Sequence, residues 1–143
     1  AVCWTGAKKG TLTAEGKPDI VVATPPDFRG HEGVWSPEDL LVAAVNCCIM
    51  TTFLYYQAKD GIDLISYRST AEGILEYGDQ GLVFTRVKVK PKVVVGLERD
   101  RQRTEQALHQ SEKSCFISNS LNSAVMLEPQ IRLAHPRGQA SEL

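Results

Sequence analysis

The chain has 143 residues, of which 43% are hydrophobic and 23% are charged, and its formal net charge is −1. This balance is typical of a single globular domain over residues 1–143 and excludes collagen-like, low-complexity and disordered chains. The near-neutral charge and the lack of a basic run argue against nucleic acid or an anionic membrane as partners. The cysteines are too few and too irregularly spaced for a disulfide scaffold (Cys3, Cys47, Cys48 and Cys115).

The chain opens with AVCWTGAKKG, which lacks the charged and apolar regions of a secretory signal peptide. We therefore expect a cytoplasmic protein, in which cysteines are more often free, metal-bound or catalytic than structural.

The first 33 residues are expected to form short strands at residues 1–5, 11–15 and 19–24. The last of these is rich in β-branched residues. Two prolines and two glycines then make residues 24–33 a loop.

A helix is predicted over residues 37–59. Ser36 can cap it, Pro37 suits its first position, and Gly61 lies just beyond its end. Its residues are apolar on nearly all sides, so we expect the helix to be buried all round.

Residues 40–58 carry no charge, which is nearly the length of a membrane-spanning helix. Asn46, Thr51, Thr52 and Gln57 interrupt the apolar run, and alternating strands follow it. A buried core helix is therefore favoured over a membrane span.

Two long strands are predicted at residues 62–77 and 82–95, joined by a hairpin at 77–81. In the second strand Val83, Thr85, Val87 and Val89 should share one face, with four cations mostly on the other (Arg86, Lys88, Lys90 and Lys92). Pro91 suggests an edge strand or a bulge.

The remaining elements are a polar helix over 97–113, with Ala107 and Leu108 as its apolar contacts, a short helix over 115–122 and a strand over 124–134. Residues 137–143 read as a frayed tail. This order of elements predicts an α+β fold, with antiparallel sheet wrapped around a central helix.

Cys48 lies in the middle of the predicted buried helix, where a cysteine commonly serves as a small hydrophobe. Cys47 points about 100° away from it on a helix, so at most one of the two is expected to be chemical. A disulfide between these neighbours would need geometry that a regular helix does not give.

Cys115 has a different setting, because Ser114 can cap a short helix that begins at the cysteine. The helix N-terminus and the neighbouring Lys113 would favour a thiolate there. An ordinary buried cysteine at a corner between two helices is the alternative.

Both cysteines lie in longer motifs, Ser36-Pro-Glu-Asp-Leu-Leu-Val-Ala-Ala-Val-Asn-Cys-Cys48 and Cys115-Phe-Ile-Ser-Asn-Ser-Leu121. The first resembles the helix start of the OsmC/Ohr family, in which the peroxidatic cysteine follows a glutamate by ten residues, so that Glu38 and Cys48 match. The second is similar to the family's Cys-Pro-x-Ser-Asn-type helix, which opens with the resolving cysteine, and Phe116 replaces the usual proline.

The resemblance implies an OsmC-like, intertwined homodimer that reduces organic hydroperoxides and, in some members, hydrogen peroxide. Cys48 would become a sulfenic acid, Cys115 would resolve it to a disulfide, and an external dithiol would restore both thiols. It also implies a role in defence against oxidative stress.

Glu38 lies about 15 Å from Cys48 along the same helix and cannot reach it within one chain. Either Glu38 contributes to the site of a partner subunit, or it stabilises its own helix through the dipole, and both roles can hold. The family arginine that steadies the thiolate has no clear match, because its register falls on Phe28. Arg29, Lys8 or Lys9 are candidates, and the absence of such a group is the alternative.

No cofactor or metal is expected. The three histidines (His31, His109 and His135) lack zinc-ligand spacing, and no phosphate-binding glycine motif is present. Trp35, Phe53, Tyr55 and Tyr56 can line an apolar substrate pocket or can belong to the core and the dimer interface.

The main hypothesis is thus a cysteine-based peroxidase with Cys48, Cys115 and Glu38 as its site. The alternative is an OsmC-like dimer that binds a small molecule or is structural, without useful peroxidase activity. The third hypothesis is cysteine-dependent hydrolysis, in which His31 would assist Cys48.

Overall fold

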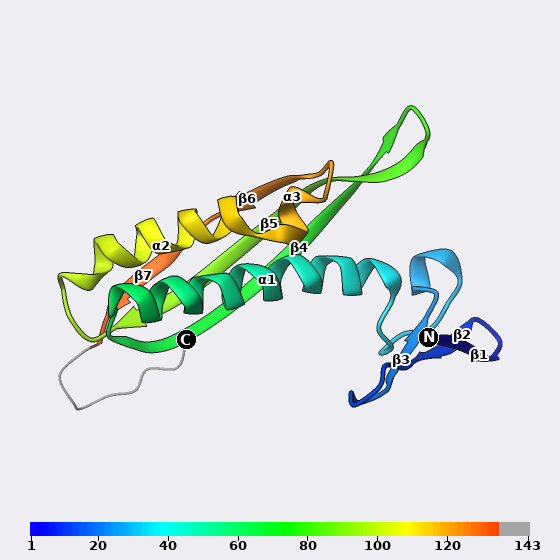
Figure 1. Cartoon of the computed structure of the whole chain (residues 1–143). Helices are drawn as coiled ribbons and strands as arrows, with labels where there is room; N and C mark the ends of the chain where they lie inside the picture. The colour runs from blue at the N-terminus through cyan, green and yellow to red at the C-terminus, as the bar shows by residue number, and fades with distance from the viewer. Residues whose placement is uncertain (135–143) are drawn as a thin grey trace. The chain divides into compact units, whose positions relative to one another are not determined.

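The computed structural model describes residues 1–134 of the chain. The predicted tail at 137–143, and His135, lie outside these residues. The chain divides into two compact units, Ala1–Leu41 and Val42–Leu143, which are described in turn. The order of elements confirms the α+β class (Figure 1), while the single domain remains a prediction.

The first unit contains a three-stranded antiparallel sheet in the order β1 (Val2–Gly6), β2 (Lys9–Leu12) and β3 (Ile20–Ala23). The strand expected at 11–15 begins two residues earlier, after a turn in which Ala7 has a φ of 45°. A 3₁₀ helix, η1 (Pro26–Phe28), occupies the predicted loop. Gly30 follows this helix in the sequence. No larger residue fits there, because a Cβ would lie 1.6 Å from the Thr24 carbonyl oxygen.

The long helix α1 (Pro37–Asp60) has nearly the predicted bounds. Ser36 and Asp39 form a reciprocal cap: the Asp39 N–H donates to Ser36 Oγ at 3.1 Å, and the Ser36 N–H donates to the Asp39 carboxylate at 2.9 Å. The helix ends at Gly61, whose φ of 62° is one that glycine adopts readily. Both termini were therefore readable from local sequence signals.

Only one stripe of α1 is buried within the chain, formed by Val45, Ile49 and Phe53 at intervals of one turn. The expected burial on all sides is thus not met within one chain, since a single sheet can cover only one side of a helix. By length and composition α1 could cross a membrane, with a mean hydropathy of 1.5. Core helices of soluble proteins pass the same test, and the buried stripe of α1 packs into two hydrophobic core clusters with β5.

The predicted hairpin is confirmed as β4 (Leu64–Gly78) and β5 (Gly81–Val95), which pair antiparallel from Leu64 to the tight turn at Gly78 and Gly81. Phe53 of α1, Val93 of β5 and Leu108 of the next helix meet in one core cluster, so both helices cover the same face of the sheet. This second unit is therefore a layer of helices on a layer of sheet.

The predicted faces of β5 are wrong on the turn side of Thr85. Ile74 pairs with Arg86 and Leu75 pairs with Phe84, so Thr85 is the extra residue of a β-bulge. An extra residue reverses the alternation of faces. After the bulge, from Val87 onward, the odd-numbered residues of β5 are buried. Before the bulge the odd-numbered Val83 is instead 44% exposed, so it does not share a face with Val87 and Val89.

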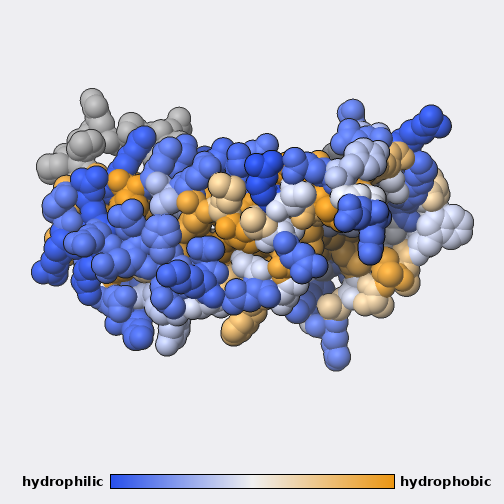
Figure 2. Space-filling model, turned by 90° about the horizontal axis from the view of Figure 1, so that it is seen from above, coloured by the Kyte–Doolittle hydropathy of each residue, from blue (hydrophilic) through white to orange (hydrophobic). Residues whose placement is uncertain are grey.

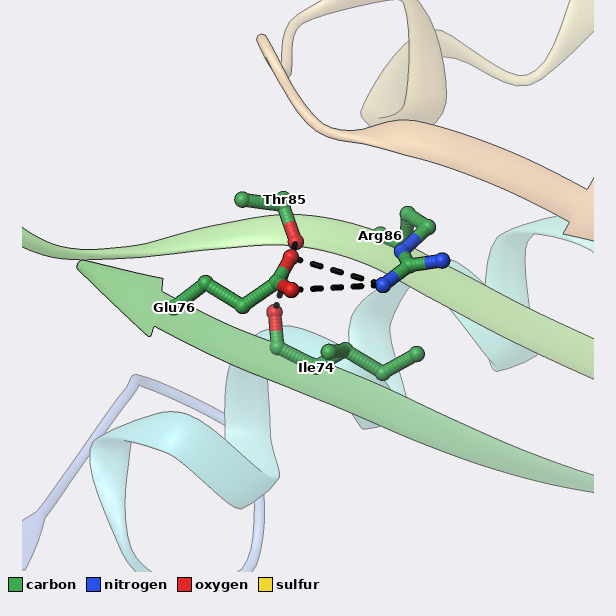
Figure 3. Close-up of polar contacts among 4 residues, drawn as sticks. All are labelled: Ile74, Glu76, Thr85 and Arg86. Carbon is green, nitrogen blue, oxygen red and sulfur yellow. Dashed lines mark hydrogen bonds and ion pairs between the residues drawn. The ribbon is translucent and has the colours of Figure 1, made fainter. Parts of the chain in front are cut away.

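Polar contacts hold this bulge (Figure 3). The Thr85 hydroxyl donates to the Ile74 carbonyl oxygen at 3.4 Å and to the Glu76 carboxylate, and Arg86 pairs with Glu76 at 3.4 Å. The Thr85 hydroxyl, and to a smaller extent Arg86, lower the pKa of Glu76 below its ordinary value. The ion pair itself is exposed, so it adds little to stability.

The strand expected over 124–134 is in fact two strands, β6 (Ala124–Leu127) and β7 (Gln130–Leu133), and both pair parallel with β5. The antiparallel expectation is corrected here: the chain returns through a helix before β6, as parallel pairing requires, and the sheet is mixed.

Pro91 does not lie on an edge strand, because β5 is the central strand of this sheet. The Val89 carbonyl faces the β6 side, where it accepts from the Glu128 N–H at 2.9 Å. Pro91, two residues further, faces the same side at the break between β6 and β7. A residue without an N–H is tolerated there because no strand is present to accept it.

The polar helix is α2 (Asp100–Ser114), whose residues Ala107 and Leu108 are buried as predicted. Asp100 fixes its start: its carboxylate accepts from the Asp63 N–H at 2.9 Å and from Arg103 at 3.0 Å. The first of these bonds is the main reason why the pKa of Asp100 is lowered. The short helix α3 (Phe116–Asn119) follows directly.

Candidate functional site

The fold brings Cys48 and Cys115 together although they are far apart in the sequence. Cys48 lies in the middle of α1, one position before the buried Ile49, and Cys115 lies at the junction between α2 and α3. Both belong to one hydrophobic cluster with Val87 and Val89 of β5. Each thiol shifts the pKa of the other, and neither is in a disulfide.

The backbone at Cys115 explains how its side chain reaches α1. The residue is extended, with φ −69° and ψ 113°, and it both ends α2 and caps α3. Its sulfur accepts a hydrogen bond from the Ser118 N–H at 3.3 Å. Cys115 is completely buried by this arrangement.

The expectation that Ser114 caps the short helix is wrong. Ser114 is the last residue of α2, and the cysteine sulfur takes the cap position in its place. The Ser114 hydroxyl instead lies 3.0 Å from the Tyr56 phenol oxygen of α1 and 3.1 Å from Gln110 Nε2. Ser114 therefore links the α2–α3 junction to α1.

Several donors act on the half-buried Cys48. Burial alone raises the pKa of Cys48, but hydrogen bonds from the Cys115 thiol, the Ile117 N–H, the Thr52 hydroxyl and the Phe116 N–H together outweigh it. The pKa of Cys48 therefore lies below its ordinary value. A thiolate at this position is the nucleophilic form of cysteine.

The pKa of Cys115 shifts in the opposite direction. Burial raises it most, and donation of its proton to Cys48 raises it further, against the lowering effect of Ser118. The proton of the pair thus remains on Cys115 while Cys48 ionises. A reactive thiolate beside a protonated thiol can form a disulfide once the first sulfur has been oxidised.

The other two cysteines are separate from this pair. Cys47 is exposed on a different side of α1, as its helical position predicted, and Cys3 is exposed on β1 in the first unit.

Glu38 lies in the first turn of α1, within the unit Ala1–Leu41, whereas both thiols lie in the unit Val42–Leu143. One of its carboxylate oxygens is buried and has no hydrogen-bond partner in this part of the chain. An unpaired buried carboxylate oxygen is unusual and requires a partner from elsewhere or from solvent. Its contribution to the site remains a prediction.

The cations considered for the thiolate have other surroundings. The Lys8 ammonium donates to the carbonyl oxygens of Phe28 and Arg29, at 3.0 and 2.9 Å. Arg29 ends η1 in the left-handed region, with φ 58°. None of the groups that act most strongly on the pKa of Cys48 is a lysine or an arginine.

Sequence reasoning missed three groups that lower the pKa of Cys48: the Thr52 hydroxyl and the N–H groups of Phe116 and Ile117. The signal for Thr52 was available, because it lies one helical turn after Cys48 and hence on the same side of α1. The N–H groups of Phe116 and Ile117 had no such signal, since they depend on the docking of α3.

The four aromatic residues have different surroundings. Phe53 is fully buried and stacks on Tyr67 at 5.4 Å between ring centroids, so it is a core residue. Tyr56 contacts Ser114, Tyr55 is 63% exposed, and Trp35 belongs to the first unit. Within residues 1–134, no three His, Cys, Asp or Glu side chains gather as metal ligands would.

Comparison with solved structures identifies the fold. An OsmC-like protein of unknown function from Vibrio cholerae is 27% identical, with a TM-score of 0.84, covering 91% of this chain and 96% of that one. An organic hydroperoxide resistance protein OsmC from Legionella pneumophila is 20% identical, with a TM-score of 0.70 and coverage of 94% and 96%. The organic hydroperoxide resistance protein OhrB of Bacillus subtilis is 18% identical, with a TM-score of 0.63 and coverage of 91% and 96%.

A search of curated proteins gave no significant match. The family model described as OsmC-like protein matches residues 30–130, which include both cysteines and Glu38. The resemblance noted in the two cysteine motifs and the arrangement of helices and strands thus agree with this match, and the chain belongs to the OsmC-like protein family.

Proposed function

We propose that this protein is a thiol-dependent peroxidase that reduces organic hydroperoxides, with Cys48 as the reacting thiol and Cys115 as the resolving thiol. The observation that carries the proposal is the packing of both thiols in one hydrophobic cluster, where the pKa of Cys48 is lowered and that of Cys115 is raised. Membership of the OsmC-like family, with neighbours described as organic hydroperoxide resistance proteins, supports it.

The proposed catalytic cycle has three steps. The Cys48 thiolate attacks the outer oxygen of the hydroperoxide, the O–O bond breaks, and the alkoxide takes up a proton to leave as an alcohol. The Cys115 sulfur, on losing its proton, then attacks the Cys48 sulfenic acid, which releases water and forms the disulfide. An external dithiol reduces this disulfide and is itself oxidised. We include hydrogen peroxide as a smaller alternative substrate.

The proposal includes a homodimer. In the single chain α1 buries only one stripe, and large apolar side chains on its other sides remain exposed, among them Leu54 and Tyr55. A second copy of the chain would cover such a surface in an isologous interface. It would also offer the unpaired Glu38 carboxylate a place in the partner's site.

The test is hydroperoxide consumption with a small dithiol as reductant, measured for the parent protein and for three variants. Cys48→Ser should reduce turnover by at least about a hundredfold, because the alcohol is a far weaker nucleophile than a thiolate at neutral pH. Without the dithiol, Cys115→Ser should consume one equivalent of hydroperoxide per chain and accumulate a sulfenic acid, which a dimedone probe captures. Cys47→Ser, the matched neighbour, should retain the parent rate.

Undiminished turnover in Cys48→Ser would refute the proposal. Equal loss in the Cys47→Ser and Cys48→Ser variants would also contradict it, because it would locate the effect in the helix and not in the pair. Such results would favour the alternative of a small-molecule-binding or structural dimer.

A further inference from the structure

The lysines of β5 lie on the face of the sheet opposite α1 and α2. Val89 and Val93 pack into the core clusters with these helices. Because neighbouring residues of a strand point to opposite faces, Lys90 and Lys92 point away from the helices. The outer face of the sheet is therefore positively charged along its central strand.

The neighbouring strand β4 adds polar groups to this outer face. Ser69 donates to a side chain of α1 at 2.7 Å, so it faces the helices, and Arg68 and Thr70 on either side of it face outward. In the register of the sheet, Arg68 lies opposite Lys92 and Thr70 lies opposite Lys90. Like charges directly opposite each other are unfavourable in a sheet, so this arrangement attracts an anion.

The outer face is hollowed at these residues. A hollow of about 150 Å³ is lined by three cations and two residues with hydroxyl groups: Arg68, Lys90, Lys92, Ser69 and Thr70. We call it the cationic hollow. A water molecule occupies about 30 Å³ in the liquid, so the hollow has room for a phosphate group. Its cations and the Thr70 hydroxyl are hydrogen-bond donors suited to the oxygens of such a group.

A second hollow of about 390 Å³ adjoins the first, because Thr70, Lys90 and Lys92 line both. It lies at the break between β6 and β7, where Pro129 also lines it. Its volume is in the range typical of small-molecule sites. Glu128 lines it as well and pairs with Lys90 at 3.9 Å, with both side chains about half exposed. This carboxylate would compete with a bound anion for Lys90.

We propose that this face of the sheet binds a small phosphate-bearing molecule, with its phosphate in the cationic hollow and the rest of the molecule in the second hollow. A phosphate group carries up to two negative charges and three acceptor oxygens, which the lysines and the Thr70 hydroxyl complement. A long polyanion would need cations along its length, whereas the whole chain has a formal net charge of −1. The site is separate from the proposed peroxidase chemistry, because the thiols lie on the helix side of the sheet.

The experiment titrates inorganic pyrophosphate into the full, reduced chain by isothermal titration calorimetry, at an ionic strength held constant with sodium chloride. Lys90→Gln and Lys92→Gln each remove one positive charge from the cationic hollow. Lys88→Gln is the matched control, because Lys88 lies on the same face but lines neither hollow and is opposite Glu72. Glu128→Gln removes the competing carboxylate. Circular dichroism checks that each variant is folded, and Lys92→Arg, which retains the charge, is a second variant at that position.

We expect the parent protein to bind pyrophosphate saturably, with a dissociation constant below about 1 mM. Lys90→Gln and Lys92→Gln should each weaken binding by about tenfold, the effect of losing one hydrogen bond between charged groups. Lys92→Arg and Lys88→Gln should bind as the parent does. Glu128→Gln should bind more tightly, by up to about fivefold, because an exposed ion pair no longer holds Lys90.

The absence of saturable binding to the parent protein would overturn the inference. Equal weakening by Lys88→Gln and Lys92→Gln would also overturn it, because that pattern indicates attraction by the general charge of the face. Tighter binding of a DNA duplex than of pyrophosphate at the same ionic strength would contradict a small-molecule site. All variants retain Cys48 and Cys115, so the result is independent of the peroxidase assay.

Discussion

At the scale of single residues, the two cysteines are distinguished by opposite shifts of their pKa values. Burial raises the pKa of Cys115 most, whereas at the half-buried Cys48 the neighbouring donors outweigh burial and lower the pKa. An isolated cysteine on an apolar helix face is ordinarily an inert core residue. The neighbouring donors distinguish Cys48 from that case.

This arrangement predicts opposite pH behaviour for the two thiols. The rate at which Cys48 reacts with a hydroperoxide should rise with pH and reach half its maximum below the pH typical of a free cysteine, about 8.5, because its pKa is lowered. Cys115 should react with a thiol reagent only at higher pH. Stopped-flow kinetics measure the reaction of Cys48 with the hydroperoxide, and alkylation at different pH values measures the reactivity of Cys115.

Replacement of Cys48 by alanine tests the coupling between them. The pKa of Cys115 should fall in Cys48→Ala, because the acceptor that holds its proton is gone, although burial still raises it. An unchanged alkylation profile for Cys115 would show that the two thiols do not interact.

At the scale of the elements, Gly73 allows α1 to approach β4. A Cβ at this position would lie 2.6 Å from the side chains of both Phe84 and Val42. We predict that Gly73→Ala lowers the free energy of unfolding by about 1–3 kcal/mol through overpacking, as measured by chemical denaturation. Gly78→Ala, on the same strand, is the control: its Cβ would lie 3.3 Å from the exposed Val83 side chain and 3.7 Å from the Gly81 carbonyl oxygen. Equal stability of the two variants would contradict the close packing.

Local signals in the sequence were sufficient for the termini of α1 and for the hairpin. The Ser36 cap and Gly61 act within a few residues, and the turn is bounded by Gly78 and Gly81. The bulge at Thr85 was missed because it depends on Phe84 packing over Gly73, a contact between strands. The break between β6 and β7 was visible in principle, since Pro129 lies between the two strands and proline has no N–H for a sheet.

The candidate site was predictable only in part, because some of its contacts also depend on segments that are distant in the sequence. Cys48 and Cys115 were selected by motifs, and the fold brings them into contact. Thr52 followed from helical spacing but was not considered, and the N–H groups of α3 depend on tertiary docking.

At the scale of the whole molecule, the exposed apolar surface predicts self-association. Hydrophobic side chains reach the surface between hydrophilic ones in Figure 2. On α1, Leu54 and Tyr55 are 38% and 63% exposed. Single exposed hydrophobic side chains are normal on a protein surface. On a long apolar helix that is buried along only one stripe, they indicate an interface.

We therefore expect a dimer by size-exclusion chromatography with light scattering. Tyr55→Asp should shift it toward the monomer, because a charge at the centre of an interface is costly to desolvate. Gln106→Asp, on an exposed side of α2, is the control and should remain dimeric. A monomeric parent protein would contradict the predicted assembly.

The most direct test of the central claim is the mass of the whole protein after one equivalent of an organic hydroperoxide, followed by alkylation of the remaining thiols and peptide mapping. The account predicts rapid loss of two hydrogens per chain, with Cys48 joined to Cys115 and with Cys3 and Cys47 alkylated. Four reduced cysteines after prolonged exposure, or a disulfide that excludes Cys48, would contradict it.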